Sequence, residues 1–128
     1  ARLAIASRFA AGAQNEERSL LRPRARVNQL LTGMANWAFN QGDYVTDTIN
    51  GFRAMRRADL LALETTVKRF PIEYQISIRS MLRRWPILEI PAIENDRAGG
   101  ESKALSWPVG MYHLKVLFSE MPAARWFR

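Results

Sequence analysis

The sequence predicts one α+β domain, a helical body with a small antiparallel sheet formed mainly by the C-terminal third. Over residues 15–85, apolar side chains recur three and four positions apart, which is typical of helices that bury one face. Over residues 86–128 the apolar period shortens to two, which indicates mainly strand and loop. Because 128 residues suffice for one core and are too few for two, we assign residues 1–128 to a single domain.

The N-terminal residues 1–14 are expected to form a strand or an arm. In an extended chain, LAIASRF at residues 3–9 places alternate apolar side chains on one side, although its alanines leave a helix open. Asn15 is expected to cap a short helix that ends at Pro23. Pro23 then begins a longer helix that stops at Gln41–Gly42. The apolar stripe expected on this helix is Val27, Leu30, Leu31, Met34, Trp37 and Ala38.

The stretch DYVTDTINGFRAMRR fits two structures. Asn50–Gly51 between β-branched residues is a strong hairpin signal. Folded as a hairpin, however, neither side of the stretch is uniformly apolar. A helix begun by an Asp43 cap would instead align Val45, Ile49, Phe52 and Met55 on one face, so we favour the helix.

Two further helices are expected before the period changes. The first begins at an Asp59 cap and ends at Pro71, and the second runs from Pro71 to a stop at Pro86. PILEIPAI then reads as a short extended run, and GMYHLKVLF alternates like a strand. A flexible connection containing Gly99–Gly100 separates them. The exposed edges of so small a sheet invite pairing, which predicts a homodimer.

Positive charge is concentrated in the middle of the chain. The net charge is +7, and 16 of the 19 basic residues are Arg. Residues 53–84 hold eight basic and three acidic residues, so we expect an anionic partner: nucleic acid, with RNA favoured, or an acidic protein surface. Two simpler explanations stay open, namely cations placed at helix C-termini and a GC-rich genome that favours Arg codons. The candidate binding residues are Arg53, Arg56, Arg57, Lys68, Arg69, Arg79, Arg83 and Arg84.

Exposed aromatic side chains near these clusters would let bases stack, and the candidates are Tyr44, Tyr74, Tyr112 and Trp107. The sequence holds no RRM, KH or OB motif and no basic dimer region. Binding without sequence specificity is therefore expected.

No catalytic, metal or cofactor motif accompanies the charge. The chain has no Cys, one histidine and no phosphate-binding glycine loop, so neither a metal site nor a cofactor is predicted. Asp43 and Asp47 lie four residues apart, but helix capping and dipole compensation explain both. The alternative to a binding protein is a small ribonuclease that uses His113 with a glutamate partner. We expect no enzyme.

The surroundings of the protein are predicted from the same composition. The longest apolar run is too short to span a bilayer, so no membrane partner is expected. The absence of Cys suits a reducing cytoplasm.

Several features together suggest a small viral structural protein. The chain lacks Cys, begins with Ala1, is rich in Arg, carries no enzyme motif and ends on Trp126, Phe127 and Arg128. In these features it resembles the small packaging and assembly cofactor of the double-stranded RNA bacteriophages, the cystoviruses. The resemblance implies a homodimeric component of a polymerase-complex core, in the virion or the cytoplasm, with RNA nearby. The expected function is a non-enzymatic viral or phage-type assembly or genome-packaging protein.

Overall fold

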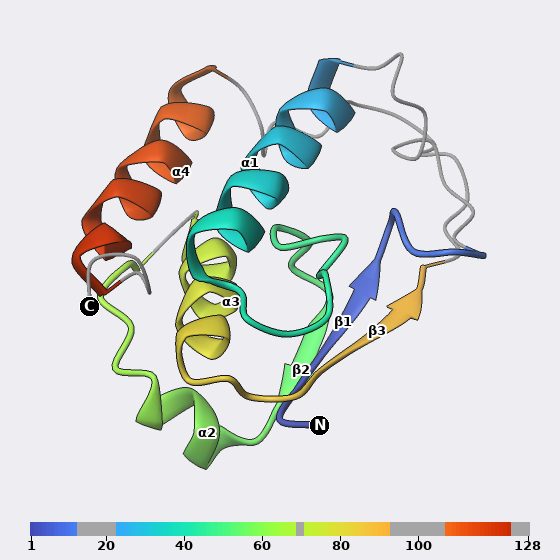
Figure 1. The fold of residues 1–128 in the computed structure, drawn as a ribbon, viewed down its shortest axis with the longest axis vertical. Helices are drawn as coiled ribbons and strands as arrows, with labels where there is room; N and C mark the ends of the chain where they lie inside the picture. The colour runs from blue at the N-terminus through green and yellow to red at the C-terminus, as the bar shows by residue number, and fades with distance from the viewer. Residues whose placement is uncertain (13–22, 69–70, 93–106, 124–128) are drawn as a thin grey trace.

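The structure is a computed structural model, and it describes residues 1–12, 23–68, 71–92 and 107–123. It is α+β, as predicted, with helices packed beside a three-stranded sheet (Figure 1). Three helices, α1, α3 and α4, contact one another. The elements are β1 (Leu3–Ser7), α1 (Pro23–Phe39), β2 (Arg53–Met55), α2 (Arg57–Ala62), α3 (Ile72–Leu82), β3 (Ile87–Pro91), α4 (Trp107–Glu120) and a 3₁₀ turn at Met121–Ala123.

The sheet is mixed, with strand order β2-β1-β3, and so it differs from the antiparallel C-terminal sheet that was predicted. β1 runs antiparallel to β2 and parallel to β3, and Leu3 pairs with both Met55 and Ile87. The N-terminal strand is therefore central, and only β3 comes from the last third. As a result, the start of β1, the end of β2 and the start of β3 lie at one end of the sheet.

The core confirms β1, α1 and α3, although α1 presents a different face from the one predicted. Alternate residues of β1 are fully buried, and they pack with Leu31, Phe39 and Tyr74 from the helices. Val27, Leu30 and Trp37 of the predicted stripe are exposed instead. In their place α1 buries Asn28, Thr32 and Asn36, whose side chains hydrogen-bond within the helix and, for Thr32 and Asn36, to the segment that follows it.

That following segment, residues 43–52, is not a helix, so this prediction is wrong. The Asp47 carboxylate accepts hydrogen bonds from the backbone N–H groups of Ile49 (3.2 Å) and Asn50 (3.0 Å), a local turn that competes with helix formation. Glu89 accepts from the backbone N–H groups of Thr46 (2.8 Å) and Asp47 (3.0 Å). These bonds hold the backbone in an irregular path, and the chain then enters β2 as a strand.

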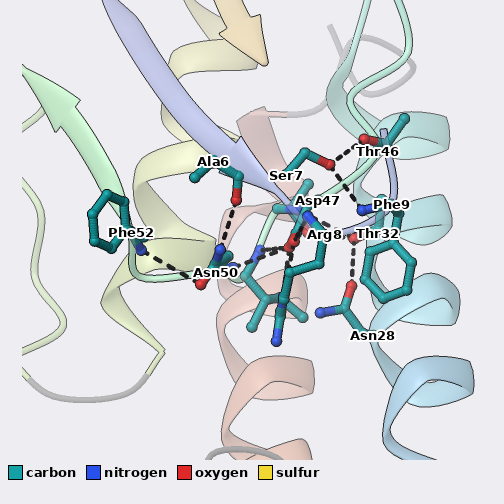
Figure 2. Close-up of polar contacts among 12 residues, drawn as sticks. Ala6, Ser7, Arg8, Phe9, Asn28, Thr32, Thr46, Asp47, Asn50 and Phe52 are labelled. Atoms are coloured by element: carbon teal, nitrogen blue, oxygen red, sulfur yellow. Dashed lines mark hydrogen bonds and ion pairs between the residues drawn. The ribbon is translucent and has the colours of Figure 1, made fainter. Parts of the chain in front are cut away.

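Asp47 is the centre of this polar network (Figure 2). Its side chain is fully buried and pairs with Arg8, whose Nε lies 3.0 Å from Oδ2. Burial alone would raise the pKa of Asp47, but the charge and hydrogen bonds of Arg8 outweigh it, and the pKa lies below its ordinary value. The carboxylate therefore stays ionised at neutral pH and holds the end of β1 against the loop.

Two other predictions about secondary structure are wrong. Residues 110–118, expected to alternate as a strand, lie in α4, where His113, Val116 and Leu117 are buried at helical spacing. The helix expected from Asp59 to Pro71 ends at Ala62, and Asp59 lies within its first turn rather than at its cap. After the cap, Glu64 adopts a left-handed conformation with φ of 52°, and the Gln75 side chain then accepts from the N–H groups of Thr66 and Val67, which a continued helix would use. The Asn15 helix and the Gly99–Gly100 connection lie outside the described residues.

Candidate nucleic-acid interface

The candidate interface begins where α3 ends. Arg83 caps the helix, the Arg84 N–H donates to Met81 O (3.0 Å), and the Trp85 N–H donates to Ser80 O (3.0 Å). This pair of bonds is the Schellman motif, in which the residue after the cap adopts the left-handed conformation and is usually glycine. Arg84 occupies that position with φ of 56°, at a cost of about 1–2 kcal/mol relative to a right-handed conformation. The sequence thus retains a guanidinium where glycine would fit better.

Two guanidinium groups lie over the indole ring of Trp85, the next residue. Arg2 lies with its Cζ 4.9 Å from the ring centroid, and Arg83 lies 5.7 Å away, both within cation–π range. Arg2 is fixed there because its backbone N–H donates to Pro86 O (3.0 Å). Arg83 is tied to α2 because its Nη2 donates to Ala62 O (2.9 Å).

Arg56 joins the group through a shared carboxylate. Asp59 accepts from Arg56 Nε at 3.0 Å and from Arg2 Nη1 at 3.4 Å. The Asp59 side chain is 7% exposed, whereas those of Arg56 and Arg2 are 76% and 47% exposed. The Asp59 carboxylate therefore lies beneath the side chains of Arg2 and Arg56, and their guanidinium groups face water.

These residues form what we term the Trp85 patch, at the end of the molecule that holds the N-terminus and α2 (Figure 1). Two arginines lie over one half-buried indole, one carboxylate joins Arg56 to Arg2, and the exposed Arg57 and Arg84 are the chain neighbours of these residues. The patch consists of Arg2, Arg56, Arg57, Arg83, Arg84 and Trp85.

The structure brings together four of the eight predicted binding residues, namely Arg56, Arg57, Arg83 and Arg84. Lys68 is exposed on the connection between α2 and α3, and Arg69 lies outside the described residues. Arg79 is engaged internally: its Nε lies 2.6 Å from Glu120 Oε1, and its Nη1 donates to Leu63 O at 2.8 Å. Arg79 therefore joins α3 to α4 and to the chain after α2.

Arg53 is also engaged internally. Its guanidinium donates to Asn50 O, Glu73 O and Ser77 Oγ at 3.0 Å each, and to Thr48 O at 3.3 Å. Burial lowers its pKa to about 10, which still leaves it protonated at neutral pH. Arg53 thus satisfies backbone carbonyls of the loop and of α3.

Sequence reasoning missed Arg2 and Trp85 as members of the site. Trp85 was assigned to the buried line of α3, and Arg2 stands isolated among alanines and apolar residues. The available signal was the pairing of the N-terminal strand with the run after Pro86, which would have placed Arg2 next to Trp85.

The remaining candidate aromatic and catalytic side chains lie elsewhere. Tyr44 and Tyr112 are exposed, whereas Tyr74 is buried, donates to Leu31 O at 2.6 Å and has its pKa raised by burial. The side chain of Trp107 lies outside the described part. His113 is 1% exposed, with its ring centroid 5.4 Å from that of Tyr74. A polymer phosphodiester cannot reach a ring so deeply buried in this conformation, and the ribonuclease alternative stays a prediction.

Within the described ranges, no group of three or more His, Cys, Asp or Glu side chains is placed to hold a metal ion. The helices described there include none with the length and apolar character needed to cross a bilayer. No protein-family model, curated protein or solved structure matches the chain.

Proposed function

We propose that the Trp85 patch binds the phosphate backbone of a single-stranded nucleic acid, with RNA favoured, without reading its sequence. The observation that carries this proposal is that Arg2 and Arg83, from two separate segments, both lie over the Trp85 indole, while exposed Arg56 shares the Asp59 carboxylate with Arg2. Guanidinium groups bind phosphates bidentately, and an aromatic ring offers a stacking surface to any base. Proteins that bind single strands combine these two elements.

The wider role we propose is that of a non-enzymatic assembly or genome-packaging protein of viral or phage type. A patch that contacts phosphates suits a genome, because every sequence presents the same backbone. Arg56 caps a short helix that begins at Arg57 and has six residues, a geometry that does not present a recognition helix to a groove.

The test is fluorescence anisotropy with labelled single-stranded RNA, duplex RNA and duplex DNA at low and physiological salt. Arg56→Glu/Arg83→Glu should weaken binding of the single strand at least tenfold and flatten its salt dependence. The matched control is Lys68→Glu/Lys115→Glu, which changes the net charge equally at exposed positions outside the patch. Equal losses in the two variants would reject the patch. No binding even at low salt would favour an acidic protein surface as the partner.

The predicted homodimer stays a prediction, and β3 is the feature that favours it. β3 is an edge strand in the described sheet, and Leu88 and Ile90 are about half exposed on the same side of it. Leu88→Lys/Ile90→Lys should yield a monomer in sedimentation experiments if a second copy covers this strand. An unchanged sedimentation coefficient would exclude that arrangement.

A further inference from the structure

A pocket of about 290 Å³ lies beside the Trp85 patch, between the turn that follows α1 and the start of β3. Buried Val45 and Met81 contribute its apolar lining. The exposed polar side chains that line it are Gln41, Asp43 and Arg84. The pocket therefore combines an apolar interior with a polar rim, the usual composition of a small-molecule site.

The pocket and the patch share two residues. Arg84 and Trp85 line the pocket and also belong to the patch. A strand held by its phosphates on the patch would therefore pass the mouth of the pocket. The left-handed backbone of Arg84, which places a strained residue at this junction, is the kind of feature that clusters at binding sites.

The turn that forms one side of the pocket is already fixed. The Asn40 amide donates to Asn36 Oδ1 and to Asp43 O, both at 2.8 Å, and its Oδ1 accepts from the Gly42 N–H at 2.9 Å. The side chains of Gln41 and Asp43 make no hydrogen bond within the described part of the chain. They are consequently free to contact a ligand without dismantling the turn.

The charges on the rim indicate what kind of ligand fits. A phosphate would be attracted by Arg84 but repelled by the Asp43 carboxylate, so the pair disfavours a phosphate in the pocket. A planar base would suit the apolar interior, and its edge could use both charges. The volume is at the lower end of the range for ligand pockets, which suits one base rather than a larger group.

We propose that this pocket takes one unstacked guanine of the strand bound by the Trp85 patch. Guanine alone among the four bases combines adjacent N1–H and N2–H donors, suited to a carboxylate, with the O6 and N7 acceptors that suit a guanidinium. Asp43 and Arg84 would supply these two groups. The inference rests on the proposed function, in which the patch binds the strand without preference for any base. The pocket would add a preference for guanine.

The test compares labelled heptauridylate with heptamers that carry a central guanosine, adenosine or inosine. The guanosine heptamer should bind about tenfold more tightly than heptauridylate, and inosine, which lacks the N2 amino group, should lie between them. Asp43→Asn should abolish the preference, which is the ratio of the affinity for the guanosine heptamer to the affinity for heptauridylate. Glu64→Gln, which removes an exposed carboxylate elsewhere, should retain the preference.

Failure of this inference is distinguishable from failure of the proposed function. If Arg56→Glu/Arg83→Glu weakens every heptamer but guanosine is not preferred, or Asp43→Asn keeps the preference, the pocket assignment is wrong and the patch stands. If the double variant binds all heptamers normally, the proposed function fails.

An NMR measurement on the unmodified protein removes any dependence on variants. The Trp85 indole N–H resonance should shift with the guanosine heptamer more than with heptauridylate. A shift that also occurs with free guanosine monophosphate would show that the pocket binds the nucleotide outside a strand. A shift that occurs with the guanosine heptamer and not with guanosine monophosphate would show that the pocket binds guanine only as part of a strand. No difference among the three ligands would overturn the proposal.

Discussion

The guanidinium of Arg2 lies 4.9 Å from the centre of the Trp85 ring, and the pairing of β1 with β3 holds the two residues together. Arg2 N–H donates to Pro86 O, so the backbone, rather than the cation–π contact, sets this position. The side chain is therefore free to exchange the indole for a phosphate without loss of the strand.

Replacement of Arg2 by Gln should test this role. We expect a three- to tenfold loss of affinity for single-stranded RNA at low salt, because one phosphate contact disappears. The slope of log affinity against log salt should fall by about 0.7 for one lost contact on a single strand. Stability should change by no more than about 1 kcal/mol, since the Arg2 side chain is about half exposed and Asp59 keeps Arg56 as its partner. An unchanged salt slope, with Lys68→Gln as the reference, would remove Arg2 from the interface.

Arg84→Gly should separate stability from binding. Glycine adopts φ of 56° without strain, so the free energy of unfolding should rise by up to about 1 kcal/mol while RNA affinity falls. Arg83→Gly is the matched control, because Arg83 has a right-handed conformation with φ of −85° and should lose about 0.5–1 kcal/mol. Urea denaturation and anisotropy measure the two effects. Lower stability in Arg84→Gly would mean that the guanidinium has a structural role.

Arg53→Lys should destabilise the fold without a direct effect on nucleic-acid binding. A lysine ammonium cannot reach the four acceptors that the Arg53 fork contacts, and those left unpaired in the interior cost about 2–4 kcal/mol together. Arg57→Lys, at an exposed position, should change stability by less than about 0.5 kcal/mol. Urea unfolding of both variants is the measurement. If Arg53→Lys is as stable as the unmodified chain, the buried network is not what holds the loop.

Asp47 should make the protein sensitive to acid. Because its folded pKa is lowered, the stability it contributes is fully present above its unfolded value near 4 and is lost as pH falls through the folded value. Asp47→Asn should cost about 3–5 kcal/mol at pH 7, since Arg8 loses its buried partner.

Unfolding free energies measured from pH 7 to pH 3 should decline more steeply for the unmodified chain than for Asp47→Asn. Parallel declines would show that other groups govern acid unfolding. Asp43→Asn, which removes an exposed carboxylate, should cost less than about 0.5 kcal/mol at pH 7.

Local patterns were sufficient to predict part of this fold. The alternation of Leu3, Ile5 and Ser7 predicted β1, and Pro23 and Pro71 marked the starts of α1 and α3. The α4 stretch carries both periods, since its apolar residues satisfy alternation as well as helical spacing, and only the packing of Val116 and Leu117 against the core decides between them.

The other incorrect predictions concern residues whose structure depends on partners distant in the sequence. The shape of residues 43–52 depends on Arg8 and Glu89, which no local window includes. For the same reason, the prediction from local charge assigned Arg53 and Arg79 to the binding surface, although their hydrogen-bond acceptors lie in the interior. Arg56 and Arg57 stand at the start of α2, and Arg83 and Arg84 follow the end of α3, so helix boundaries place these four predicted residues; their role in binding stays a prediction.

The central position of β1 has a consequence for how the chain folds. Its first partner, β2, follows after nearly 50 residues, and the parallel partner β3 after more than 80. During synthesis, both edges of β1 therefore stay unpaired until β2 emerges, one edge stays unpaired until β3 emerges, and closure of such long loops slows folding. Over that interval its apolar residues are open to association with other chains, so the yield of native protein should depend on concentration and on chaperones.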